Sequence, residues 1–361
     1  MKLKRSPFIA LAVLLIIILS TGTLYLYLVN KTKVFKLPTY SITGKSVKAT
    51  PSPPALPKKP SVLDGTLVDP NLTNRHPLGV MIENHPDARP QYGLSSASVV
   101  YEAIAEGGIT RFLAIFGSND AAKVGPIRSA RTYFADWCNE YDCFYAHVGG
   151  NYDALYDKIP GDKIKDIDEF ANALAYHREP HDNVALEHTM YSSTNKLWAL
   201  ANSKKWTTFL RDDYAIYSFL DEPKTPGVAT VSAITIDFST PLFLVKYEYD
   251  KGHNTYMRSL AGAPHIDAIN KQQLVAKNII IQYIGRTDAT TVINEHGFAM
   301  PTVGSGKATM YQGGTKIEGT WKKPDKYSRT QFLDASGALI KLYAGPTWIE
   351  IVNPGSTVKD S

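Results

Sequence analysis

Val99-Val-Tyr-Glu-Ala-Ile-Ala-Glu106 leads into Gly107-Gly108, and Ile109-Thr-Arg-Phe-Leu-Ala-Ile-Phe116 follows. Two glycines between runs of strand-forming residues indicate a β-hairpin with a two-residue turn. In that register residue 106 pairs with 109, and residue 104 pairs with 111. Because side chains alternate along a strand, Arg111 is expected diagonal to Glu102 and Glu106 and within reach of both carboxylates.

An α/β pattern surrounds this hairpin over residues 77–148. Residues 78–84 read as a short buried strand that ends in polar side chains. Two helices are expected after the hairpin region, where polar residues suited to capping precede apolar periodicity. They are residues 166–176 and residues 190–202, the second with Ser192 or Ser193 as its cap.

The second half of the chain has a different pattern. Residues 220–227 form a dense cluster of turn residues, which is typical of a domain boundary. Short β-like runs then alternate with turns at the spacing of a β-rich module. These runs are residues 228–238, 242–249, 278–284, 306–312, 314–322, 331–333, 339–342 and 347–352.

The N-terminus combines a short basic segment with a long apolar run. No charge falls between Phe8 and Val29, and about 20 apolar residues cross a hydrocarbon core of about 30 Å. A cleaved signal peptide is one alternative, but no Ala-x-Ala site follows, and a cytoplasmic core helix is another. Thr23 stands where a bacterial lipobox would place its cysteine, so lipidation there is excluded. We predict an uncleaved anchor.

Residues 30–63 carry seven lysines and no acidic residue, and they are rich in proline. Such a segment cannot build a core and is expected to be an extended linker whose lysines attract anionic headgroups or wall polymers. The formal net charge of the chain is +5, but it becomes −5 when these lysines and the three basic residues before the anchor are excluded. A nucleic-acid partner is therefore not indicated.

The expected fold class is an α/β (α+β) N-terminal domain followed by a β-rich C-terminal domain, with a single N-terminal transmembrane helix. The chain divides into a cytoplasmic tail at 1–7, a transmembrane anchor at 8–29, a Lys/Pro-rich disordered linker at 30–75, the N-terminal domain at 76–220 and the C-terminal domain at 228–354.

Lysines lie on both sides of the anchor, so the positive-inside rule does not decide its orientation. The two cysteines, Cys138 and Cys143, are compatible with export. A pair so closely spaced forms a small-loop disulfide in an oxidising compartment, and two reduced thiols are the alternative. We expect a single-pass protein of the cell membrane with the bulk of the chain outside the cytoplasm.

Candidate functional residues gather near the ends of the predicted strands. Arg128 and Arg131 lie at a turn-to-helix start, where guanidinium groups and a helix N-terminus hold phosphate or carboxylate. His147 precedes a glycine pair, where backbone amides approach a ligand closely. General acid–base chemistry would use Glu102 or Glu106 with His147. The predicted ligand-binding residues are Glu83, Asn84, Arg111, Arg128, Ser129 and Arg131, and a structural network of salt bridges is the alternative.

We expect no metal and no cofactor. His177, His181 and His188 are close in sequence, but Pro180 breaks the helix that would align the first two. The sequence has no Walker loop, no Rossmann fingerprint, no His-Glu-x-x-His and no Gly-x-Ser-x-Gly elbow.

Several blocks of the sequence resemble the YerB-like family, a bacterial family of unknown function whose members are typically lipoproteins. These blocks include Gly79-Val-Met-Ile-Glu-Asn84, Ala105-Glu-Gly-Gly-Ile-Thr-Arg-Phe112, Val124-Gly-Pro-Ile-Arg-Ser-Ala-Arg131, Glu179-Pro-His181, Tyr256-Met-Arg258, Gly262-Ala-Pro-His-Ile-Asp267 and Gly345-Pro-Thr-Trp-Ile349. The resemblance covers residues 76–354 and implies two adjoining domains at the cell surface, with no established reaction. Thr23 in place of the lipobox cysteine implies a protein anchor, and Asp182 departs from the family's usual asparagine.

These observations predict an extracytoplasmic protein of the cell envelope. The leading hypothesis is a binding or scaffolding factor that recognises an anionic wall polymer or an envelope-assembly partner, with the arginines making the charged contacts. A wall hydrolase that uses Glu102 or Glu106 with His147 is the second hypothesis. A purely structural envelope module is the third. The sequence leaves enzymatic activity undecided and leans against it.

Overall fold

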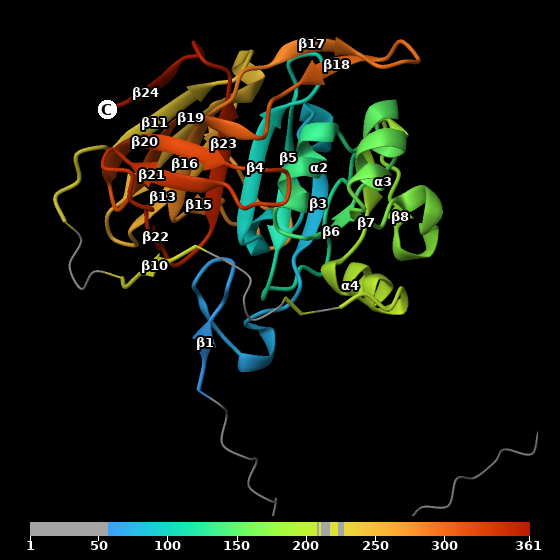
Figure 1. Ribbon diagram of the computed structural model, residues 1–361, viewed down its shortest axis with the longest axis horizontal. Helices are drawn as coiled ribbons and strands as arrows, with labels where there is room; N and C mark the ends of the chain where they lie inside the picture. The colour runs from blue at the N-terminus through green and yellow to red at the C-terminus, as the bar shows by residue number, and fades with distance from the viewer. Residues whose placement is uncertain (1–56, 208, 211–216, 223–226) are drawn as a thin grey trace, which may run out of the picture. The chain divides into compact units, whose positions relative to one another are not determined.

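The computed structural model describes residues 57–207, 209–210, 217–222 and 227–361 (Figure 1). The predicted cytoplasmic tail, the transmembrane anchor and most of the linker lie outside the described residues. Within those described residues, no helix has both the length and the apolar character needed to cross a membrane. They are mostly sheet, with few helices.

One mixed sheet of ten strands takes strands from both halves of the chain. Its order is β21 (Gln331–Asp334), β20 (Thr315–Lys323), β19 (Gly304–Gln312), β16 (Asn278–Tyr283), β23 (Thr347–Val352), β4 (Val99–Ile104), β5 (Thr110–Phe116), β3 (Leu78–Glu83), β6 (Phe144–Ala146) and β7 (Lys165–Asp166). β23 and β4 run parallel and side by side, with Glu350 opposite Glu102 (Figure 1). The segments predicted as separate domains therefore share one continuous sheet.

The central strands β3, β4 and β5 are buried along their whole length. Their near-continuous apolar sequences are typical of strands that are covered on both faces. We call the two faces of this sheet inner and outer. The inner face carries Val80, Ile82, Val100, Phe112 and Ala114, and the outer face carries Met81, Tyr101, Ala103, Leu113 and Ile115.

A second sheet covers the inner face. Its order is β14 (Ala263–Pro264), β13 (Thr255–Leu260), β12 (Leu244–Asp250), β11 (Ala233–Asp237) and β24 (Val358–Asp360), and β15 (Val275–Ala276) also pairs with β13. Burial alternates along β11 and β13, because one face of this sheet is packed and the other is solvated. Tyr247 of β12 meets Trp348 of β23 with ring centroids 6.4 Å apart, which joins the two layers.

Helices complete the packing. α2 (Thr132–Asn139) covers the outer face, where Trp137 stacks on Tyr101 with centroids 5.3 Å apart. α4 (Thr194–Ser203) contributes Leu197 to the inner-face core. α3 (Ile159–Gly161) is a single turn that follows a π-helical segment at Asp153–Lys158.

Four two-stranded ribbons lie outside the two sheets. They are β1 (Lys59–Pro60) with β2 (Leu67–Val68), β8 (His177–Arg178) with β9 (Met190–Tyr191), β10 (Phe219–Leu220) with β22 (Leu342–Tyr343), and β17 (Thr287–Thr290) with β18 (His296–Ala299). Leu63, between β1 and β2, is buried in the outer-face core. The linker predicted to be disordered up to residue 75 is therefore ordered over the part that the structure describes.

The predicted hairpin is present, but its register differs by one residue. Both turn glycines have positive φ, and Ile109 N–H donates to Glu106 O at 2.9 Å, as a two-residue turn requires. Ala105 N–H, however, donates to Ile109 O at 2.8 Å, so Glu106 is an extra, bulged residue. As a result Ala103, not residue 104, pairs with Arg111.

This shift moves side chains between faces, because the side-chain period of a strand is two. Glu102 pairs with Phe112 and points to the inner face. Arg111 pairs with Glu83 and points to the outer face. The prediction that Arg111 reaches Glu102 is therefore wrong, whereas Arg111 does reach Glu106, at 3.7 Å.

Of the two predicted helices, one is confirmed. Ser193 caps α4 by accepting the N–H of Lys196 at 3.3 Å, and residues 190–191 form β9 instead of a first turn. The helix predicted at 166–176 is wrong: the segment forms two 3-10 turns, Glu169–Ala171 and Ala173–Ala175. The carboxylate of Asp168 accepts the N–H of Gly149 at 2.7 Å, a contact with a distant loop that competes with a local helix.

Candidate functional site

The inner face holds a buried cluster centred on Glu102. Arg258 of β13 pairs with Glu102, and both side chains are fully buried. Thr110 Oγ1 donates to Glu102 Oε1 at 2.6 Å, and Asn84 Nδ2 approaches the same oxygen at 3.3 Å. The ion pair joins the second sheet to the large sheet. We call Glu102, Arg258, Tyr247, Glu350 and His265 the inner cluster.

The rest of the Arg258 guanidinium is also satisfied. Nε donates to Tyr247 Oη at 3.0 Å, and Nη1 lies 2.5 Å from His265 Nδ1. His265 Nε2 lies 2.8 Å from Gln91 Oε1. Burial first and the nearby Arg258 charge second hold the pKa of His265 well below its ordinary value, so this imidazole is neutral.

Two carboxyl groups share the single arginine of the inner cluster. Glu350, on β23, lies opposite Glu102. Its Oε1 accepts a hydrogen bond from the hydroxyl of Tyr247 at 2.5 Å. Burial, and then the neighbouring Glu102 carboxylate, raise the pKa of Glu350 well above its ordinary value. This environment favours the protonated form of Glu350, which leaves Glu102 as the carboxylate that pairs with Arg258.

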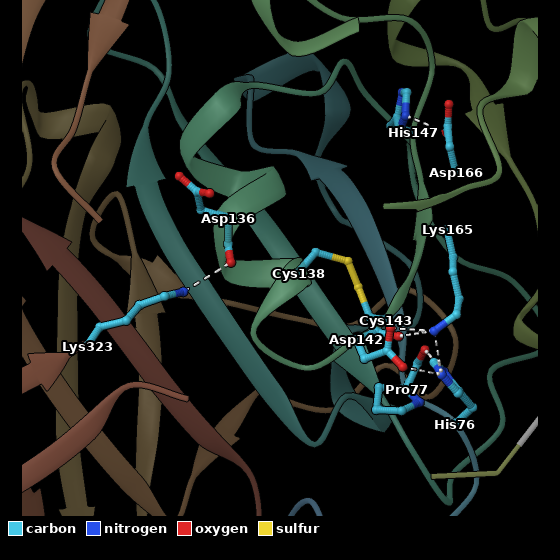
Figure 2. Close-up of a disulfide and its surroundings, with 10 residues drawn as sticks. All are labelled: His76, Pro77, Asp136, Cys138, Asp142, Cys143, His147, Lys165, Asp166 and Lys323. Carbon is cyan, nitrogen blue, oxygen red and sulfur yellow. Dashed lines mark hydrogen bonds and ion pairs between the residues drawn. A yellow bond between two sulfur atoms is a disulfide. The ribbon is translucent and has the colours of Figure 1, made fainter. Parts of the chain in front are cut away.

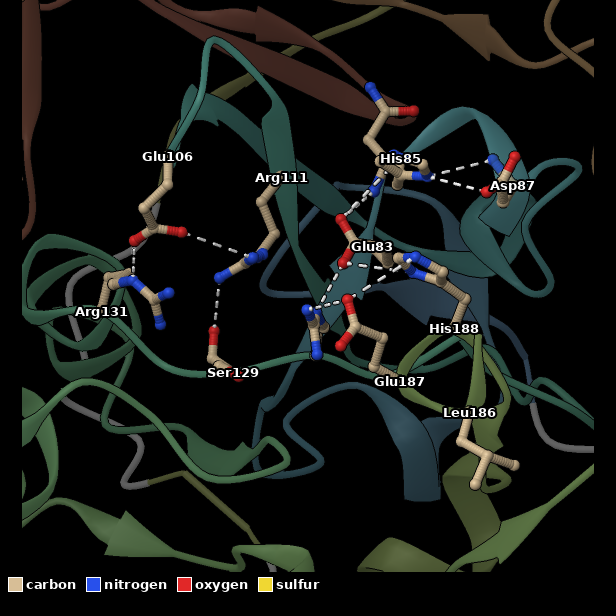
Figure 3. A network of polar contacts seen from close by, with 12 residues as sticks. Glu83, His85, Asp87, Glu106, Arg111, Ser129, Arg131, Leu186, Glu187 and His188 are labelled. Carbon is tan, nitrogen blue, oxygen red and sulfur yellow. Dashed lines mark hydrogen bonds and ion pairs between the residues drawn. The ribbon is translucent and has the colours of Figure 1, made fainter. Parts of the chain in front are cut away.

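The outer face holds two arginine–carboxylate groups (Figure 3). In the first, Glu106 pairs with Arg131 and, at 3.7 Å, with Arg111. Arg111 Nη1 also donates to the backbone oxygen of Ser129 at 3.0 Å. Arg111 is nearly buried, Arg131 is 15% exposed and the side chain of Glu106 is 33% exposed.

The second group lies where β3 ends. Glu83 Oε2 is 2.7 Å from Arg128 Nε and 3.7 Å from His188 Nδ1. Glu187 Oε1 lies 2.9 Å from Arg128 Nη2. Burial raises the pKa of Glu83, but Arg111, Arg128 and a backbone N–H outweigh burial and lower it below the ordinary value. All three predicted anion-binding arginines therefore already contact carboxylates of the same chain.

His147 is a structural residue in this arrangement. It is fully buried, its Nδ1 lies 2.8 Å from Gly149 O, and its Nε2 lies 2.9 Å from Asp166 Oδ1 (Figure 2). A Cβ on Gly149 would lie 2.8 Å from the ring of Phe170, so this glycine permits close packing of Phe170. The described contacts of the His147 ring nitrogens are therefore all with neighbouring protein groups.

A disulfide joins Cys138, in α2, to Cys143, which precedes β6 (Figure 2). Its Cα atoms are 5.4 Å apart, and both residues lie in the outer-face core. Next to it, Asp142 contacts His76 Nε2 at 3.2 Å and the ammonium of Lys165.

The predicted site residues are thus divided. Glu102 belongs to the inner cluster and Asn84 contacts it, whereas Glu83, Glu106 and the three arginines belong to the outer face. Arg258 was not among the residues predicted from the sequence. In the structure, burial alternates along β13, and Arg258 takes an inward position in line with Tyr256 and Leu260. An arginine at an inward position of a strand indicates a buried ion pair.

Comparisons with known proteins fit this architecture. The family described as "Protein of unknown function (DUF3048) N-terminal domain" matches residues 63–207, and its C-terminal domain matches residues 234–349. "Putative lipoprotein YerB" of Bacillus subtilis (strain 168) is 32% identical over 305 residues, which cover 83% of this chain and 88% of that protein. The crystal structure of YerB protein from Bacillus subtilis has a TM-score of 0.73 at 29% identity and covers 84% of this chain and 100% of that chain.

The protein is therefore mostly sheet and of the DUF3048 class, with the N-terminal and C-terminal family segments joined in one ten-stranded sheet. The chain belongs to the YerB-like family, which confirms the resemblance inferred from the sequence blocks.

Proposed function

We propose that this protein is a membrane-anchored, extracytoplasmic binding or scaffolding factor of the cell envelope, and that its partner is an envelope protein. The location is supported by the relative described as a putative lipoprotein, since a lipoprotein is held at a membrane surface. In this chain the apolar run at residues 8–29 would take the role of the lipid.

The observation that carries the proposal is a set of exposed apolar side chains in residues 149–188. Tyr156 is 64% exposed, Phe170 75%, Leu174 101% and Leu186 60%. Apolar side chains that gather at a surface are typical of protein-binding sites, where aromatic residues and arginines are enriched, and these four come from one segment of the chain. We call these four side chains the apolar rim.

The segment that carries the apolar rim, residues 149–188, adjoins residues 128–131, which include Arg128 and Arg131. Ala130 N–H donates to Gly149 O at 2.8 Å, and Val148 N–H donates to Arg128 O at 3.1 Å. Leu186 directly precedes Glu187 (Figure 3). Glu187 pairs with Arg128. A partner on the rim would therefore also meet Arg128, which is 24% exposed.

The arrangement favours binding over wall hydrolysis. A glycosidase needs two carboxyl groups about 5 to 9.5 Å apart across an open cleft. Glu102 is fully buried behind Arg258, and Glu106 lies on the other face of the sheet. An anionic polymer is a weaker candidate than a protein, because it would have to displace the carboxylates from the arginines.

The test is capture of envelope proteins by the full chain in detergent, with crosslinking. The double variant Phe170→Ser/Leu174→Ser should lose a specific crosslinked protein that wild type retains. Val292→Ser, a change at a side chain that is 79% exposed on the β17–β18 turn, should not. Equal capture by wild type and the double variant would contradict the proposal. Binding to purified wall polymer that is abolished by Arg128→Ala would favour the polymer instead.

A further inference from the structure

Three potential metal ligands from two distant segments meet at the end of β3. His85 and Asp87 lie in the turn after this strand, and His188 ends the 3-10 turn Leu186–His188. One ligand atom of each residue lies within 4.8 Å of the others. Figure 3 shows the three side chains next to one another, with the rings of His85 and His188 stacked at 4.6 Å.

The burial of His188 and the contacts of its ring suit it to the role of a metal ligand. Its side chain is 7% exposed, and its Nδ1 is buried without a hydrogen-bond partner. With Nδ1 beside Glu83, Nε2 is the ring nitrogen of His188 that is left for an ion.

Glu83 orients both histidines. Its Oε1 accepts the N–H of Asn84 at 3.0 Å and of His85 at 3.2 Å, which fixes the turn that carries His85. Its Oε2 lies 3.7 Å from His188 Nδ1. Metal-bound histidines usually donate their second ring N–H to a carboxylate in this position, which directs the other nitrogen at the ion.

We propose that His85, Asp87 and His188 bind a divalent transition-metal ion, with Zn²⁺ the best match. Two imidazoles and a carboxylate are a zinc donor set, whereas Ca²⁺ and Mg²⁺ prefer oxygen alone. The site lies beside Leu186 of the apolar rim, but its Zn²⁺ binding is measured without a protein partner.

Binding of an ion requires the three ligand atoms to come closer together and the ring of His85 to turn. Bonds of about 2.0 to 2.1 Å in a tetrahedron place ligand atoms about 3.3 Å apart. His85 Nδ1 and Asp87 Oδ2 are already 3.6 Å apart. The stacked rings cannot both aim at one ion, so His85, which is 32% exposed, turns while the buried His188 stays fixed.

The neighbouring charges allow a cation here. Arg128 is held by Glu83 and by Glu187, which offset its charge. Three protein ligands leave one position for water or for Glu187, whose Oε1 lies 3.8 Å from His188 Nε2. The sequence prediction of no metal considered His188 only with the nearby His177 and His181, and it could not place His85 about a hundred residues earlier beside it.

The test uses the full chain in detergent, purified with an affinity tag that contains no histidine and freed of metal with a chelator. Zn²⁺ is titrated by calorimetry, and Co²⁺ is titrated by visible absorbance. Wild type should bind one ion per chain, and His85→Ala and Asp87→Asn should each weaken binding at least about tenfold. Both side chains are partly exposed, so these variants should fold.

His253→Ala is the matched control, because His253 is 82% exposed and lies 2.6 Å from a carboxylate of Asp250. It should bind Zn²⁺ as wild type does. Equal Zn²⁺ affinity of wild type and the double variant His85→Ala/Asp87→Asn overturns the proposal. Loss of binding in His253→Ala overturns it as well.

Discussion

Glu102 and Glu106 are four residues apart on one hairpin, yet their side chains differ in burial and point to opposite faces of the sheet. Glu102 is fully buried on the inner face and meets an arginine from the second sheet. Glu106 is one-third exposed on the outer face and meets two arginines from its own half of the chain. Because Glu106 is a bulged residue, its side chain leaves the face of Glu102. Glu102 therefore joins the two sheets, whereas Glu106 lies near the surface.

The largest expected effect comes from removing the arginine of the inner cluster. Arg258→Met leaves Glu102 without its partner in a dry site, and the free energy of unfolding should fall by about 3 to 5 kcal/mol. Urea unfolding of the full chain, followed by tryptophan fluorescence, measures this. The exposed Arg178→Met is the control and should change stability by less than about 1 kcal/mol. Equal effects of the two changes would mean that the inner pair is not closed to water.

The two inner carboxyl groups should respond differently to the same change. Glu102→Gln removes the charge that compensates Arg258, so it should also cost about 3 kcal/mol or more. Burial and then Glu102 raise the pKa of Glu350 and favour its neutral form, so Glu350→Gln at neutral pH should cost less than about 1.5 kcal/mol. A larger loss in Glu350→Gln than in Glu102→Gln would contradict the assignment of the proton.

On the outer face, Glu83→Gln should have an intermediate effect that depends on pH. The folded pKa of Glu83 lies below its ordinary value of 4.5, so its carboxylate stabilises the fold above that pH. This stabilisation, about 1 to 3 kcal/mol, is lost as pH falls through the lower folded pKa. The stability difference between wild type and variant should therefore be constant at neutral pH and shrink in acid. A difference that grows in acid would contradict this sign.

The smallest effect is expected at the bulge. Glu106→Gln weakens contacts to Arg111 and Arg131, but Glu106 itself is 33% exposed and the buried Arg111 keeps its hydrogen bond to Ser129 O, so the loss should stay near 1 kcal/mol. The exposed Glu248→Gln is its control, since Glu248 pairs only with Lys246 across 2.7 Å in the described contacts. A loss of more than about 3 kcal/mol at Glu106 would place it with the inner cluster.

Local patterns predicted much of this fold. The apolar runs of β3, β4 and β5, the serine cap of α4 and the short strands of the second half follow from composition and periodicity. The parallel pairing of β23 with β4 could not be predicted, because it joins residues about 250 positions apart and no local signal selects that neighbour.

The candidate site was predicted less well than the fold, and the hairpin that contains Glu106 shows why. The predicted residues do lie near the strand ends, but the side of the sheet on which each one lies depends on register. A bulge at Glu106 reverses the face of Arg111 relative to Glu102, and the two-glycine turn has the same sequence with or without it. The partner of Glu102 then had to come from the second half of the chain.

The central claim is that Glu102 and Arg258 form one closed pair that excludes Glu106. A double-mutant cycle of Glu102→Gln and Arg258→Met, measured by urea unfolding at neutral pH, tests it most directly. The account predicts a coupling energy of about 2 to 3 kcal/mol for this pair and additive effects, within about 0.5 kcal/mol, for Glu106→Gln with Arg258→Met. Additive effects for Glu102 with Arg258, or strong coupling of Glu106 to Arg258, would contradict it.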